Sequence, residues 1–268
     1  ATQTGLNNTV TKIATISGTL TGLSWANNSY IFLRWTDTDD AGSDSLAGVD
    51  NFSLSVPVSR NLTWNLAGSG TWDAATANWT TAGSSTAFVS GDAVTFGGTG
   101  GTITLSGSLA PLSVAVSNAS GTYTFTGATS ADKITGSASL TKSGNGILQL
   151  TSDNDYSGGT NINGGSVVVD GASRLGTGTV TLAGGTLQLA AGTYTLANAL
   201  TVASAGGSID ASADRTLSGA VSLSGIMTKL GTGSLTLGGT ISSSAGAGFN
   251  VSSGDLVLGD RKSTRLNS

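Results

Sequence analysis

The sequence predicts an all-β protein whose main part is a parallel β-helix, a solenoid of short stacked strands. Three observations lead to this fold. Short segments alternate apolar and polar residues, pairs of glycines recur along the chain, and no sustained helical period is present. The composition agrees, because 41 of the 268 residues are Gly and only 10% are charged, against roughly 25% charged in ordinary soluble domains.

The alternation predicts individual half-buried strands. Residues 122–126 place two aromatic side chains on one face and threonines on the other, and segments 102–105, 186–189 and 234–237 alternate in the same way. We expect the inward Leu, Val and Ile to stack on the equivalent side chains of neighbouring coils, while Thr, Ser and Asn face water.

The glycine pairs predict the corners between strands. Pairs 164–165, 184–185 and 206–207 follow one another at spacings of 20 and 22 residues, and pair 238–239 comes 32 residues later. Glycine permits the positive φ that a sharp corner needs, and a period of about 20 residues is the length of one solenoid turn. Residues 96–259 therefore have room for about eight coils.

An eleven-residue pattern, Lys-x-Gly-x-Gly-x-Leu-x-Leu preceded by an apolar residue and Thr, occurs at 140–150 and again at 227–237. The first copy continues through a Tyr-Ser-Gly-Gly-Thr segment at 156–160, which the second copy lacks. This pattern resembles the autotransporter-associated β-strand repeat of bacterial passenger regions. A Trp-rich stretch upstream, 70–96, is similar to the opening of such regions. The resemblance implies a right-handed β-helix on the cell surface or in secreted form, and it supplies no catalytic residues.

The chain is expected to have four parts. Residues 1–56 resemble the last strands of an exported jelly-roll-like domain and are predicted to form a partial β-sandwich. A linker at 57–60 leads to the β-helix at 61–259, and 260–268, where the basic residues cluster, is predicted to be a non-native or disordered tail. Because the sequence has no initiating Met or signal peptide, we expect an internal fragment or a processed chain.

The composition excludes several classes of function. The sequence has no Cys and no His, and all 15 acidic residues are Asp, which rules out disulfides, zinc sites built on Cys or His, and a histidine base. A net charge of −4 gives no electrostatic footprint for nucleic acid. The longest apolar run, 30–33, is far short of the roughly 20 residues that a membrane-spanning helix requires.

One acidic segment is a calcium candidate. Asp37, Asp39 and Asp44 surround a glycine turn, and closely spaced carboxylates suit a hard cation. The segment departs from the helix-loop-helix calcium pattern, because Ala41 occupies the fifth position and no Glu closes the loop. A solvated turn is the alternative interpretation. No other cofactor is expected.

Two groups of carboxylates are candidates for catalysis. Asp153 and Asp155 lie two residues apart, and Asp210 and Asp214 are followed by Arg215. Polysaccharide-acting enzymes use paired carboxylates, but Asp and Asn are also ordinary turn formers.

Three tryptophans have two possible roles. Trp64, Trp72 and Trp79 either form a platform on which sugars stack or cap the first coil, whose open edge would otherwise invite aggregation. We favour the cap.

The leading functional hypothesis is a non-enzymatic structural or adhesive segment of a large bacterial protein, located extracellularly or on the cell surface in association with the outer membrane. Its expected partners are extracellular glycans or neighbouring cell-surface proteins. The alternatives are a carbohydrate-active β-helix, either lyase or hydrolase, and calcium-dependent self-association through the acidic segment at 37–44.

Overall fold

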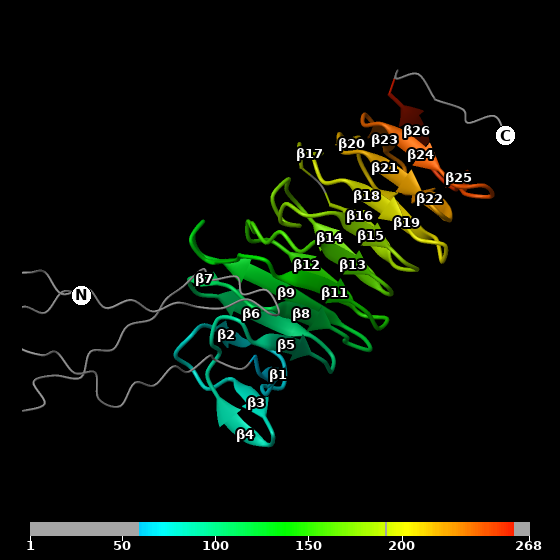
Figure 1. The fold of residues 1–268 in the computed structure, drawn as a ribbon. Helices are drawn as coiled ribbons and strands as arrows, with labels where there is room; N and C mark the ends of the chain where they lie inside the picture. The colour runs from blue at the N-terminus through cyan, green and yellow to red at the C-terminus, as the bar shows by residue number, and fades with distance from the viewer. Residues whose placement is uncertain (1–58, 191, 260–268) are drawn as a thin grey trace, which may run out of the picture. The chain divides into compact units, whose positions relative to one another are not determined.

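The computed structural model describes residues 59–190 and 192–259, which form 26 strands and no helix (Figure 1). The chain divides into two units, 1–57 and 58–268. The predicted partial β-sandwich at 1–56 and the tail at 260–268 lie outside the described residues.

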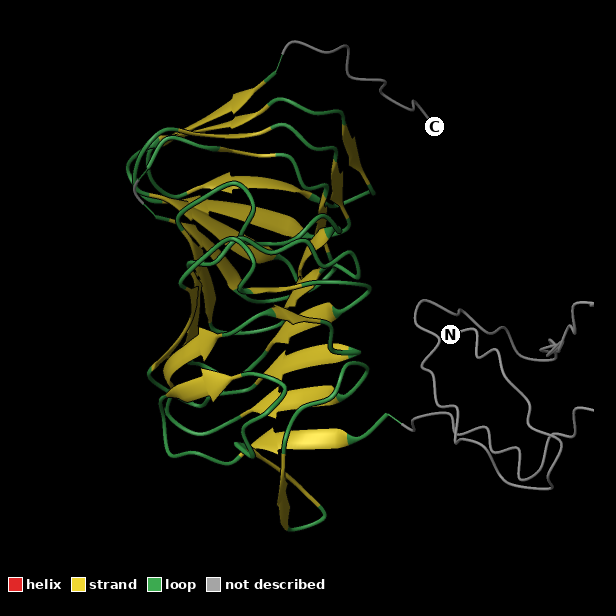
Figure 2. Cartoon of the chain, turned by 90° about the vertical axis from the view of Figure 1, so that its left-hand side faces the viewer, coloured by secondary structure: helices red, strands yellow, loops and turns green. Residues whose placement is uncertain are grey.

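The strands stack into two long sheets and a shorter third side (Figure 2). Sheet 1 contains, in spatial order, β24 (Ile241–Ser243), β21 (Val221–Leu223), β18 (Leu200–Val202), β15 (Val180–Leu182), β13 (Thr160–Ile162), β11 (Ser139–Lys142), β8 (Ser113–Val116), β5 (Ala93–Phe96), β1 (Asn61–Trp64), β3 (Trp79–Thr81) and β4 (Ser84–Thr86). Sheet 2 contains β2 (Gly70–Trp72), β6 (Gly101–Leu105), β9 (Thr122–Gly127), β12 (Ile147–Leu150), β14 (Ser166–Val169), β16 (Thr186–Leu189), β19 (Gly207–Ala211), β22 (Ile226–Leu230) and β25 (Gly248–Val251). The third side contains the pair β7 (Ser108–Leu109) and β10 (Lys133–Ile134), and the four strands β17 (Thr195–Leu196), β20 (Arg215–Leu217), β23 (Ser234–Leu237) and β26 (Asp255–Leu258).

Each complete coil runs from sheet 1 to sheet 2, crosses the third side and returns to sheet 1. Val180 of β15, for example, pairs in parallel with Leu200 of β18, 20 residues later. Two coils cross the third side without a strand, at 151–159 and 170–179. The predicted all-β parallel solenoid of about eight coils is thereby confirmed.

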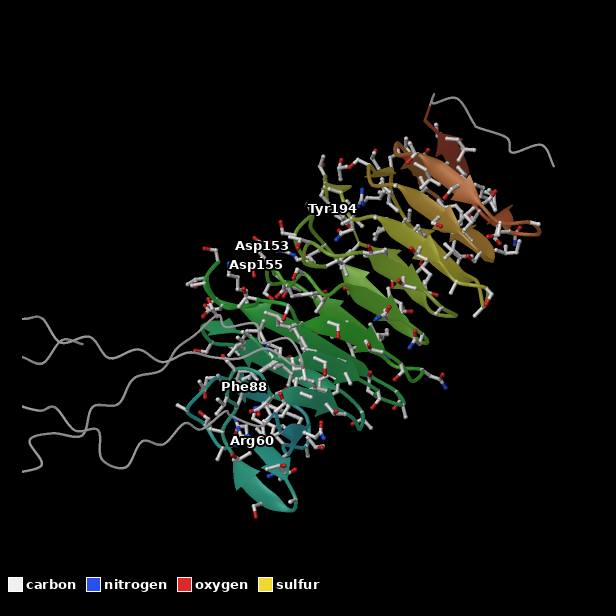
Figure 3. The ribbon with its side chains drawn as sticks, in the orientation of Figure 1. Arg60, Phe88, Asp153, Asp155 and Tyr194 are labelled. Carbon is white, nitrogen blue, oxygen red and sulfur yellow. The ribbon has the colours of Figure 1, made fainter. Side chains whose placement is uncertain are left out.

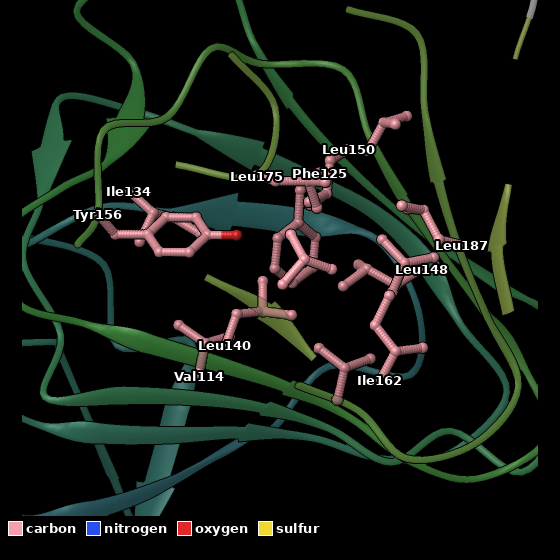
Figure 4. Close-up of a cluster of buried hydrophobic side chains, with 14 of the residues drawn as sticks. Val114, Phe125, Ile134, Leu140, Leu148, Leu150, Tyr156, Ile162, Leu175 and Leu187 are labelled. Carbon is pink, nitrogen blue, oxygen red and sulfur yellow. The ribbon is translucent and has the colours of Figure 1, made fainter. Parts of the chain in front are cut away.

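The core is a column of inward side chains held in register between neighbouring coils (Figure 4). In sheet 2, Val167, Leu187 and Ile209 are directly paired positions, and each is at most 1% exposed. The residues that alternate with them point outward and are mostly polar, as the sequence pattern predicted. Side chains of neighbouring coils therefore bury one another.

The glycine pairs do not all mark the same corner, which corrects the simple period. Pairs 164–165, 184–185 and 206–207 lie where sheet 1 turns into sheet 2, whereas pair 238–239 lies between β23 and β24, where the third side returns to sheet 1. The spacing of 32 residues arises from this change of corner.

An aromatic cluster closes the first coil. Trp64, Trp72 and Trp79 are at most 6% exposed and pack on Phe96, with ring centroids 5.1–5.6 Å from that ring. The antiparallel strands β3 and β4 extend sheet 1 beyond β1. The predicted cap is confirmed, and the sugar-stacking alternative is wrong because these indole rings are buried.

A matched pair of glycine substitutions tests the close stacking of corners. Gly98 and Gly121 both have positive φ, +73° and +66°, but a Cβ at Gly98 would meet open space, whereas one at Gly121 would overlap the carbonyl oxygen of Thr99 in the neighbouring coil. We expect Gly98→Ala to lower the free energy of unfolding by about 1 kcal/mol from backbone strain alone. Gly121→Ala should lower it by about 3 kcal/mol, since the coils must also separate.

Chemical denaturation of both variants, monitored by circular dichroism, measures this difference. Equal losses of stability in the two variants would show that the coils are not stacked this closely at the corner.

Candidate functional site

The charged side chains of the solenoid gather on its third side and the corners beside it. They include both carboxylates of the first catalytic candidate, whereas the two long sheets present mainly hydroxyl and amide side chains. Figure 3 shows Asp153, Asp155 and Tyr194 on this part of the surface. The third side is therefore the place to look for chemistry.

Asp153 and Asp155 do not form a catalytic pair, because they bind different cations. The Lys133 ammonium lies 2.6 Å from a carboxylate oxygen of Asp155. The Arg174 guanidinium contacts Asp153 through Nη1 and Asp170 through Nε, the latter at 2.7 Å. These ion pairs link successive coils across the two segments of the third side that lack a strand.

The charge state of Asp155 also argues against a role as a general acid. The hydrogen bond from Lys133 holds the pKa of the Asp155 carboxyl below its usual value. A general acid must retain a proton near neutral pH. Asp155 is instead ionised there, which suits an ion pair.

Asn154, between the two aspartates, replaces the missing strand of its coil. It is 5% exposed, and its Oδ1 accepts a hydrogen bond from the Ile134 amide of the coil before it at 2.9 Å. Its Nδ2 donates to the carbonyls of Ser152 and Arg174 at 3.0 and 2.9 Å. One side chain thus satisfies backbone groups of three segments that would otherwise be unpaired.

The other predicted group is only partly assembled. An open groove of about 890 Å³ lies over β17, β20 and β23, and it is lined by Gly192, Thr193, Tyr194, Thr195, Ser212, Ala213, Asp214, Arg215, Thr216, Gly233, Ser234 and Thr236. Asp214 and Arg215 belong to this lining, as the sequence grouped them, whereas Asp210 lies on β19 in sheet 2 and does not line the groove.

Arg215 and Tyr194 form the central contact of the groove. The guanidinium carbon lies 4.8 Å from the centroid of the Tyr194 ring, which is a cation–π distance. Nη1 donates to the carbonyl of Asp214 at 2.6 Å and Nη2 donates to that of Ala190. Burial raises the pKa of the Tyr194 phenol despite the nearby Arg215 charge, so the ring stays neutral. Sequence reasoning missed Tyr194 because it precedes β17 as a lone aromatic residue.

Two buried lysines were also missed by the sequence analysis. Lys142 and Lys229 are fully buried and take inward positions, Lys142 between Val116 and Ile162 and Lys229 beside Ile209. Each is the lysine of one copy of the eleven-residue repeat. The alternation itself places them inward, two residues after an apolar core residue.

The two ammonium groups hold the corner that follows them. Nζ of Lys142 donates to the carbonyl oxygens of Ser143 and, at 3.0 Å, Gly144. Nζ of Lys229 donates in the same way to Leu230 at 2.7 Å and Gly231 at 2.8 Å. Burial lowers the pKa of both lysines. The repeat therefore encodes a corner with an internal cation.

The remaining candidates can be placed briefly. Asp37, Asp39 and Asp44 lie outside the described residues, so the calcium site stays a prediction. Within 59–190 and 192–259, no cluster of three or more carboxylates is positioned to hold a metal ion. The same residues contain no helix long and apolar enough to cross a membrane.

Comparison with known families supports the interpretation of the repeat. The model of the passenger-associated-transport-repeat matches residues 140–169 and 227–258. Each matched stretch begins with a lysine corner. The predicted resemblance to an autotransporter passenger repeat is thus confirmed at these two places. No curated protein and no solved structure matches the chain.

The corner lysines lead to a prediction with an internal control. Lys142→Met keeps the length and apolar stem of the side chain but leaves the carbonyls of Ser143 and Gly144 without their charged donor. We expect the free energy of unfolding to fall by about 2 kcal/mol. Lys133→Met removes only a partly exposed ion pair with Asp155 and should cost less than about 1 kcal/mol.

Denaturant titration of both variants compares the two costs. If Lys142→Met were as stable as the parent chain, the buried ammonium would have no structural role at the corner.

Proposed function

We propose that this chain is a non-enzymatic structural and adhesive segment of a bacterial cell-surface or secreted protein. The observation that carries the proposal is that both passenger-associated repeats build corners of one parallel solenoid. Such a segment works by holding its sides in a fixed geometry toward the surroundings, which requires no catalytic group.

The fold suits a role outside the cell, where proteases are abundant. Backbone amides are committed to ladders between coils, and neighbouring coils are in register along both sheets. Cleavage by a protease requires local unfolding of several residues. In a solenoid such unfolding exposes the core of the adjacent coils as well, which makes it costly.

The absence of a suitable acid and base pair supports a non-enzymatic role. Asp153 and Asp155 are each engaged with a cation. Among the residues that line the groove, only Asp214 carries a carboxylate, and one of its oxygens accepts a hydrogen bond from the Ser234 amide at 2.9 Å. A polysaccharide hydrolase of the usual kind needs two carboxylates facing the same bond.

The proposed partners are extracellular glycans or neighbouring surface proteins, and the proposed location is the cell surface in association with the outer membrane. The third side offers the charged and aromatic groups that such contacts use. The long sheets offer hydroxyl and amide groups.

Limited proteolysis tests the structural part of the proposal. The lysines and arginines between 61 and 258 are buried, paired or within strands. We therefore expect trypsin to leave 61–258 uncut under native conditions, with the fragment identified by its intact mass. The same chain unfolded in urea serves as the control and should be cut at Lys133, Lys142, Arg174, Arg215 and Lys229. Early native cuts at Arg174 or Lys133 would contradict a rigid third side.

A cleavage assay separates the proposal from the carbohydrate-active alternative. Acidic and neutral polysaccharides are incubated with the full chain, and new reducing ends and unsaturated products are measured. We expect no turnover above the buffer control. Turnover by the parent chain that disappears in Asp153→Asn, Asp155→Asn, Asp210→Asn or Asp214→Asn would establish an enzyme instead.

A further inference from the structure

The groove over β17, β20 and β23 contains a buried cation whose charge is not balanced by a carboxylate. Arg215 is 5% exposed, and both of its hydrogen bonds go to main-chain carbonyls. Its buried Nε has no hydrogen-bond partner. A buried charge or donor left unpaired is costly and calls for an explanation.

The other cations on the outside of the solenoid are treated differently. Arg60 binds Asp92 at 2.6 Å, Lys133 binds Asp155 at 2.6 Å, and Arg174 contacts two aspartates. The corner lysines spend their donors on consecutive carbonyls of the corner that they hold. Arg215 differs from both groups, because it lines a groove and keeps an unused donor.

We propose that this groove binds the carboxylate of a sugar, namely a uronic acid residue of an acidic polysaccharide. The guanidinium presents the planar array of donors that a carboxylate matches. This inference deepens the adhesive part of the proposed function by naming the class of partner, and it rests on that function.

The rest of the lining fits a sugar ring. Tyr194 is partly exposed, and aromatic rings provide an apolar face with a polar edge. Thr195, Thr216 and Thr236 are directly paired positions on adjacent strands, so their hydroxyls form a row with the strand spacing of about 4.8 Å. The Asp214 oxygen that does not bind the Ser234 amide can accept a sugar hydroxyl.

Electrostatics favours a single carboxylate over a dense polyanion. The chain carries a net charge of −4, and Asp214 lies beside Arg215 in the groove. A polyphosphate would be repelled overall. One carboxylate per sugar, placed on one guanidinium, matches the charge that the groove provides.

The direct test is calorimetric titration of the full chain with tetragalacturonate, and with its fully methyl-esterified form as the neutral probe. We expect binding of the acid that weakens at least about tenfold on esterification, since the ester loses the charge that pairs with Arg215. Arg215→Gln should weaken binding by a similar factor. Arg174→Gln, a third-side arginine outside the groove, is the matched control and should bind as the parent chain does.

A second variant covers the case in which Arg215→Gln does not fold. Thr216→Trp fills the groove from an outward position of β20 and leaves Arg215 in place. It should melt within a few degrees of the parent chain and lose binding at least about tenfold. The proposal is overturned by any of three results: no binding of tetragalacturonate by the parent chain, equal binding of acid and ester, or unchanged binding by Thr216→Trp.

Failure of this inference and failure of the proposed function give different results. If the groove binds no acidic sugar, the resistance of 61–258 to trypsin and the absence of turnover are unaffected. If tetragalacturonate is bound and also cleaved, the groove assignment holds while the non-enzymatic role is wrong.

Discussion

The constraint on which this structure depends is the in-register parallel stacking of coils. Because each inward residue is directly opposite an inward residue of the next coil, a side chain is buried by its neighbours and not by its own coil. Val251 illustrates this point. It occupies the same ladder as Ile209, which is fully buried, yet it lies on the last strand of sheet 2 and is 46% exposed. A polar residue placed in such a ladder must therefore find its partner within the column, since water does not reach it.

The corner lysines follow from this constraint, and they explain why the repeat is not a coil. The first copy turns from sheet 1 to sheet 2, between β11 and β12, whereas the second turns from sheet 2 to the third side, between β22 and β23. The same residues thus build two different corners. What the copies share is local: a strand, an inward lysine, a glycine with positive φ at Gly144 or Gly231, and a second strand. The ammonium satisfies carbonyls that the turn leaves without partners in either place.

Much of the fold could be predicted from sequence because alternation and glycine corners are local properties. The strands at 122–126 and 186–189 were visible in this way. The change of corner at 238–239 was not, since it depends on how many residues a coil spends on its third side. The pairing of Asp153 with Arg174 and of Asp155 with Lys133 was hidden for the same reason, because it joins different coils. Burial of Lys142 was predictable in principle from its position two residues after Leu140, but lysine is ordinarily a surface residue.

The ends and the third side of the solenoid solve different problems. At the first coil the stack lacks a neighbour on one side, and large rings fill the space: Trp72 contacts Trp79 and Phe88 edge to face at 5.3 and 5.4 Å. The indole N–H groups of Trp72 and Trp79 have no conventional acceptor, and this edge-to-face packing places positive ring edges on aromatic faces. Such a cap stabilises but has no exposed chemistry. On the third side, by contrast, two coils have no strand, and the ladder rule is relaxed. Buried or paired polar groups such as Asn154, Arg174 and Arg215 are tolerated there. Specific recognition needs polar groups at fixed positions, so in this fold it belongs on the third side, where the backbone constrains the side chains least and the neighbouring sheets hold them still.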